Sequence, residues 1–203
     1  MSGADAILAV MAVGTLGAGL GVAGQGLIST GAVDKIEYCR QPSGAVTVGV
    51  LLLVRVENRT STPIILSRVT TVGGYQLSKH RVGALPLLNY TASREEIVDD
   101  SGFDTYFPPA DLFDILHPGA TVKRAVRLDF PFEPLQRAMS GPQAEYWLRV
   151  RLRHWPSSLA RVSKLRRGWA RYGLLWTEDS DVAPVALTVQ REPNVGRCVG
   201  RFH

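Results

Sequence analysis

Charged side chains are almost missing from the first part of this 203-residue chain. Asp5 is the only charged residue before Asp34, so residues 6–33 form one uncharged run. A helix over residues 6–28 would be about 35 Å long, and crossing a bilayer takes about 20 residues. No Lys or Arg precedes the run, whereas a secretory signal starts with basic residues. Residues 1–33 are therefore predicted to form one membrane-spanning helix of a single-pass membrane protein.

The glycines of this segment favour a helix that packs against another helix. Four of them are spaced three or four residues apart and share one side of a helix, as in a glycine zipper. A face without side chains lets a second helix approach closely, so we expect other membrane-protein subunits to bind there. The four positions are Gly14, Gly17, Gly21 and Gly24. Three neighbouring glycines also read G-x-G-x-x-G, but no strand–helix series follows to build a dinucleotide site.

Helical periodicity is sparse after residue 33, where apolar and polar residues alternate instead. Such alternation is typical of strands with one buried face. The clearest runs are residues 46–56, 122–128, 148–152 and 185–189. Turn sequences such as Gly73–Gly74 separate the runs. Seven or eight strands of this kind predict an all-β fold, an antiparallel β-sandwich over residues 34–203. The stretch VRVENRTSTPIIL and a Pro–Gly turn before a strand loosely resemble an immunoglobulin-like domain, and this resemblance concerns the fold alone.

Motifs for catalysis or cofactor binding are absent. The chain has no G-x-S-x-G elbow, Walker loop, H-E-x-x-H or C-x-x-C. The nearest approach to a metal cluster is Asp111, Asp114 and His117 on a short helix expected over residues 111–116. Pro118 would end that helix, and Asp111 is equally suited to cap it. We therefore predict a non-enzymatic protein with no cofactor and no metal site.

Cysteine is scarce, and its two positions bear on the compartment. Cys39 and Cys198 lie near the two ends of the predicted β domain, where a sandwich can bring its termini together. A disulfide between them would indicate an oxidising compartment; two free buried thiols are the alternative. Lys35 and Arg40 follow the apolar run, which favours a cytoplasmic domain by the positive-inside rule. The sequence thus leaves the side of the membrane undetermined.

Acidic residues are also missing between Glu145 and Glu178, where basic residues gather in a strand and loop over residues 147–171. On the strand, the basic residues alternate with apolar ones and are expected on one face, together with Trp147 and Trp155. We expect this surface to bind anionic lipid headgroups or an acidic protein, with nucleic acid a less favoured partner. The proposed contacts are Arg149, Arg151, Arg153, Lys164, Arg166, Arg167 and Arg171.

These patterns predict an accessory or structural subunit of a larger membrane protein assembly. The glycine face would meet partner helices, and the basic sheet face would meet headgroups or an acidic subunit. Two alternatives stay open. One is an exported soluble β-sandwich binding domain whose N-terminal signal is cleaved. The other is a virion structural protein with a β-sandwich body, whose basic surface would face the genome.

Overall fold

Strands make up most of the protein, as the alternating pattern predicts. The structure is a computed structural model, and it describes residues 26–83, 85–92, 106–155 and 159–198. Among these residues, helices are confined to two short segments, α1 (Phe132–Ala138) and α2 (Leu159–Trp169). The all-β class is therefore confirmed.

Most strands belong to one large sheet. The strands are β1 (Leu27–Arg40), β2 (Val46–Asn58), β3 (Ile64–Ser67), β4 (Thr71–Ser78), β5 (Leu88–Thr91), β6 (Phe113–Leu116), β7 (Thr121–Pro131), β8 (Gln143–Arg153), β9 (Leu174–Leu175), β10 (Ser180–Gln190) and β11 (Gly196–Arg197). The large sheet has the order β5-β4-β8-β10-β1-β2-β7, with β11 beside β1, and β6-β3-β9 form a small sheet. Neighbouring strands are antiparallel except in the pairs β1–β10, β1–β11 and β3–β9.

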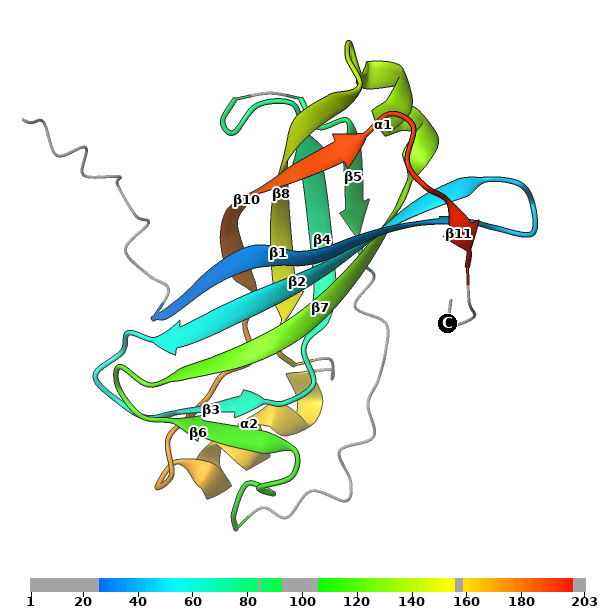
Figure 1. Ribbon diagram of the computed structural model, residues 1–203. Helices are drawn as coiled ribbons and strands as arrows, with labels where there is room; N and C mark the ends of the chain where they lie inside the picture. Colours follow the sequence, from blue (N-terminus) through cyan, green and yellow to red (C-terminus); the bar gives the residue numbers. More distant parts are fainter. Residues whose placement is uncertain (1–25, 84, 93–105, 156–158, 199–203) are drawn as a thin grey trace, which may run out of the picture.

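The large sheet curls until its two ends approach each other (Figure 1). The ring of Tyr75 on β4 packs edge-on against the ring of Phe130 on β7, with 4.8 Å between the ring centroids. These two strands are far apart in the order of the sheet. The sheet therefore faces itself across one core. The two layers expected of a sandwich come from a single curled sheet, because strand twist accumulates across so many neighbours.

The main core lies inside this curl, and β2 runs through its middle between β1 and β7. Its inward residues are almost fully buried: Val48, Val50, Leu52, Val54 and Val56. The inward residues of β7, β8 and β10 complete the core: Val126, Leu128, Phe130, Leu148, Val150, Leu152, Val185, Leu187 and Val189. Each large apolar side chain buried there contributes about 1.5–3 kcal/mol. The period of two predicted for these four strands is confirmed.

A second, smaller core joins the small sheet to α2. Leu165 and Trp169 of α2 pack with Ile65 of β3 and with Phe113 of β6. Trp155 also belongs to this cluster, so its predicted place on the basic face of β8 is wrong: the strand ends before it, and the chain turns inward. The helix predicted over residues 111–116 is wrong as well, because residues 113–116 pair with β3 as a strand.

The N-terminal prediction is corrected where the structure describes the chain. Residues 27–33 are the start of β1, paired with β2 from Leu27 onward, and not the end of a helix. Leu27 and Ser29 are buried, so the β domain begins before the predicted boundary after residue 33. The four glycines proposed for helix packing lie outside the described residues. Within the described part, no helix combines the length and the apolar character needed to cross a membrane.

Candidate functional site

The basic residues of β8 alternate with its core residues, as predicted. Leu148, Val150 and Leu152 point into the main core, and Arg149 and Arg151 lie on the opposite, outer surface. The outer sides of β4, β5 and β10 continue this surface on either side of β8. We call the outer surface of β4, β5, β8 and β10 the groove face.

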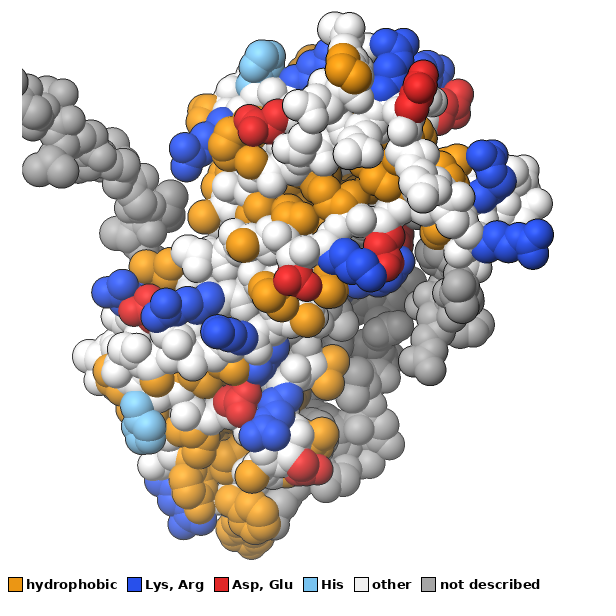
Figure 2. All heavy atoms as spheres, in the orientation of Figure 1, with side chains coloured by type: hydrophobic (Ala, Val, Ile, Leu, Met, Phe, Trp, Pro, Cys, Tyr) orange, Lys and Arg blue, Asp and Glu red, His pale blue; other side chains and the backbone are white. Residues whose placement is uncertain are grey.

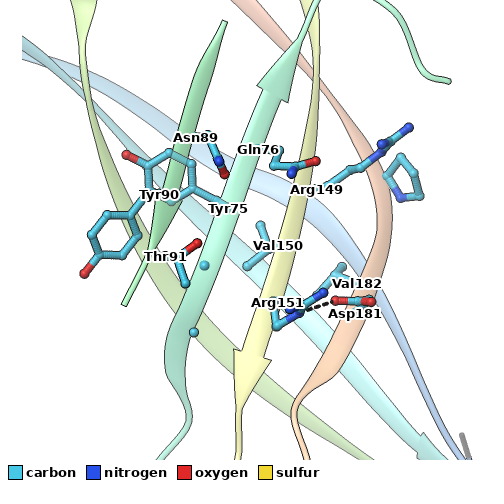
Figure 3. Close-up of a pocket in the computed structure, with 13 residues that line it drawn as sticks. Tyr75, Gln76, Asn89, Tyr90, Thr91, Arg149, Val150, Arg151, Asp181 and Val182 are labelled. Carbon is cyan, nitrogen blue, oxygen red and sulfur yellow. Dashed lines mark hydrogen bonds and ion pairs between the residues drawn. The ribbon is translucent and has the colours of Figure 1, made fainter. Parts of the chain in front are cut away.

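A groove crosses this face, and Gly73 and Gly74 of β4 are among the residues that line it (Figure 3). Gly74 of β4 lies in register between Arg151 of β8 and Thr91 of β5. A Cβ atom at Gly74 would approach the carbonyl oxygen of Tyr90 to 2.8 Å, so the close approach of β5 requires glycine there. The polar side chains that line the groove are Gln76, Asn89, Thr91, Arg149, Arg151 and Asp181.

The two arginines of the groove differ in their partners. Arg151 donates from Nε to Asp181 Oδ1 at 3.0 Å, and this carboxylate raises the pKa of Arg151. Arg149 donates from Nη2 to the backbone oxygen of Arg81 at 2.6 Å, and it forms no ion pair with any described residue. Since a guanidinium has five N–H donors, both side chains keep donors for a ligand. The groove therefore offers an oriented arginine beside one whose charge is not neutralised.

The other predicted basic residues lie elsewhere. Arg153 is only 11% exposed; it sits 3.8 Å from Asp179 and donates to the backbone oxygen of Ala92. Arg166 donates to Thr177 Oγ1 at 2.5 Å, and Arg171 donates to the backbone oxygen of Tyr106. Lys164 and Arg167 are exposed on α2, which packs beside the small sheet, away from the groove (Figure 1). Of the seven predicted contacts, the groove brings together only Arg149 and Arg151.

A buried serine–histidine chain lies at the end of β8. Nε2 of His154 is 2.7 Å from Ser180 Oγ, which is 3.0 Å from Ser29 Oγ. Burial and the nearby charge of Arg124 lower the pKa of His154 to about 4. All three residues of the chain are at most 3% exposed, so no substrate can reach the hydroxyls. Serine and histidine often act in catalysis, but the burial of these three residues indicates a structural role.

Asp114 has structural partners as well. Its carboxylate accepts from Arg68 at 2.9 Å and from Arg124 at 2.6 Å, and Arg124 is itself only 12% exposed. Because Asp114 lies on β6 and Arg124 on β7, this network ties the small sheet to the large one. The predicted helix that would have grouped Asp114 with Asp111 and His117 is a strand instead.

A disulfide closes the C-terminal end of the described chain. Cys39 at the end of β1 is bonded to Cys198, and their Cα atoms are 4.7 Å apart. The pairing of β1 with β11 brings the two cysteines together, since Cys39 is in register with Gly196. Disulfides persist in oxidising compartments.

The groove contains residues that the sequence did not single out. Gly74 was expected in a turn, and Gln76, Asn89, Thr91 and Asp181 had no predicted role. In the sequence, these positions are marked only by polar residues that alternate with apolar ones on β4 and β10. The cross-strand register places them beside the arginines. No protein-family model matches the chain, and no curated protein sequence matches it.

Proposed function

We propose that the protein is a non-enzymatic accessory subunit of a larger membrane assembly, and that its groove face binds an anionic group of lipid or of an acidic partner. One observation carries the proposal: Arg149 and Arg151 lie side by side on the outer surface of β8, next to the hollow at Gly74. A carboxylate or phosphate in the hollow would meet both guanidinium groups.

The neighbours of the arginines fit this role. Asp181 holds the guanidinium of Arg151 in place, which reduces the conformational entropy lost on binding. Gln76 is in register with Arg149, and Asn89 is in register with Gln76, so two amides extend the row of donors to the edge of the sheet. Each surface cation adds about 1 kcal/mol of attraction to an anionic membrane. The contact is therefore one of several that hold the subunit in its assembly.

The finer parts of the proposal concern anchoring and scaffold. The uncharged N-terminal run supports a membrane helix that ends before β1, with Gly14, Gly17, Gly21 and Gly24 as its packing face. The curled sheet and its sandwich-like core support a scaffold of the immunoglobulin-like kind. The disulfide favours an oxidising side of the membrane for the β domain.

The disulfide also favours a second candidate, an exported soluble binding domain with a cleaved N-terminal signal. The mass of the mature chain separates the two. A mass that includes residues 1–25 supports the anchored subunit, and a mass that lacks them supports the exported domain.

Vesicle binding tests the groove. We expect R149Q/R151Q to weaken binding to vesicles of phosphatidylcholine with phosphatidylglycerol, or to soluble polyglutamate, by about tenfold or more. Stability should change by less than about 0.5 kcal/mol, because both side chains leave the core untouched. R55Q/K123Q is the matched control: these exposed cations are in register on β2 and β7 and lie outside the groove. Equal binding by the two double variants would refute the groove as the site.

A further inference from the structure

The loop between β4 and β5 carries apolar side chains into the solvent. Val82 is 77% exposed and Leu85 is 93% exposed, and no other large apolar residue that the structure describes is as exposed as these two. Gly83 between them has φ +76°, a conformation that favours glycine, and a Cβ there would meet nothing within 4 Å. Val82 and Leu85 thus project into the solvent, and the space beside Gly83 is open.

Basic residues flank the tip. Lys79, His80 and Arg81 precede it and are exposed, and the sequence has no acidic residue between Glu57 and Glu95. On the neighbouring strand β8, the one acidic residue is Glu145. An apolar tip next to cations is the combination that binds the boundary between acyl chains and anionic headgroups.

The base of the loop is held in place. Ser78 Oγ donates to the backbone oxygen of His80 at 2.7 Å, and the backbone N–H of Leu87 donates to the oxygen of Leu77 at 2.7 Å. These contacts close the hairpin below the tip. The loop therefore presents its apolar residues from a fixed base, and insertion costs little additional ordering there.

The loop is also joined to the groove. Arg149, one of the two groove arginines, donates to the backbone oxygen of Arg81. The guanidinium of Arg81 in turn lies over the ring of Trp147, 5.3 Å from its centroid. Arg81 of the loop and Arg149 of the groove therefore lie next to each other beside the apolar tip.

We propose that the β4–β5 loop inserts Val82 and Leu85 into the interfacial region of an anionic bilayer while the adjacent cations bind headgroups. This inference rests on the proposed function and selects lipid as the anionic partner. A bilayer is favoured over a protein because valine and leucine are under-represented among the anchor residues of protein interfaces. The affinity for a bilayer, by contrast, rises with each methylene group that the bilayer buries.

Two variants of the full chain test insertion directly. We expect V82S/L85S to bind phosphatidylglycerol-containing vesicles about tenfold more weakly than the wild type, with unchanged binding to polyglutamate. The matched control is V69S/L174S, which removes two apolar side chains that are 55% and 50% exposed elsewhere. In L85W, the difference spectrum against the wild type should shift to the blue on these vesicles and be quenched by lipids brominated on their acyl chains.

The outcomes separate this inference from the proposed function. If V82S/L85S binds vesicles as the wild type does, or the added tryptophan stays in water, insertion is refuted, while weaker binding by R149Q/R151Q still supports the groove. Binding to polyglutamate without binding to vesicles also refutes insertion and identifies an acidic protein as the partner. If neither probe binds the wild type, the proposed function fails together with the inference.

Discussion

The two halves of the large sheet share one core but differ in the partners of Arg127 and Arg149 on their outer surfaces. On the outer surface of β1, β2 and β7, which we call the paired face, Glu37 contacts Lys35 at 2.5 Å and Arg127 at 3.3 Å. Arg127 also pairs with Asp129 at 3.3 Å. Basic and acidic side chains accordingly lie next to each other over these strands in Figure 2. On the groove face, Arg149 has a backbone oxygen as its partner in place of a carboxylate.

This difference shows what distinguishes a solvated sheet surface from a binding surface. The paired face also has a strand glycine, Gly49, but the space above it is filled by the guanidinium of Arg127. At Gly74, on the groove face, the backbone of β5 takes the corresponding space, and the groove beside it is lined by Arg149, Arg151 and Asp181. A side chain that already forms an ion pair within the protein gains little binding energy from a ligand. Arg149, which has no carboxylate partner among the described residues and lines the groove, can form an ion pair with a bound anion.

Acid should have the largest effect on stability, through the buried His154. His154 follows β8 and stays neutral in the folded state until about pH 4, while the unfolded chain binds the proton near pH 6.5. The unfolded state therefore binds more protons in this window, and stability falls as the pH drops from 6.5 towards 4. The shift corresponds to about 3 kcal/mol at its full extent. The pKa of Glu37 on the paired face is lowered instead, chiefly by its hydrogen bond with Lys35.

Urea unfolding at pH 7, 6 and 5 measures this effect. The wild type should lose stability over the series, and H154Q, which cannot bind the proton, should show a flatter dependence from a lower starting value. The same slope in both proteins would mean that another group is responsible.

Glycine replacement should have the next largest effect. We expect G74A to lose on the order of 1–3 kcal/mol of unfolding free energy, because the new methyl group meets the backbone of β5 and must displace it. G49A is its counterpart on the paired face, where the methyl meets the end of the flexible Arg127 side chain, and its change should stay within about 0.5 kcal/mol. Thermal or urea unfolding of both variants checks the comparison, and equal losses would contradict it.

Removing single acids should have the smallest effect on stability and still change binding. D181N frees the charge of Arg151 on the groove face, and we expect binding to anionic vesicles to become about fivefold tighter, as for one added surface charge. E37Q frees Lys35 and Arg127 on the paired face and should tighten binding less, because the pocket beside them is smaller than the groove and the apolar tip lies on the β4–β5 loop. If vesicle sedimentation shows a larger increase in affinity for E37Q than for D181N, the membrane contact lies on the paired face and the prediction is contradicted.

The sequence by itself determined the strands and their faces. Val48, Val50 and Leu52 alternate with outward residues over a distance that one strand spans, and the same local period places Arg149 and Arg151 outward on β8. A period of two requires no knowledge of the neighbours, because the geometry of a single strand sets it. The all-β class and the position of these arginines follow from that property.

Only the tertiary structure decided which residues meet. The pair Gly73–Gly74 is typical of a turn, but β5 and β8 pair with Gly74 from either side and hold it inside a strand. Arg153 has the same strand period as Arg151, yet its side chain is largely covered and lies beside Asp179 and the backbone oxygen of Ala92. Ser29 and His154 are joined through Ser180 across a wide separation in sequence. Register, curl and burial are properties of several strands together, and local alternation carries no information about them.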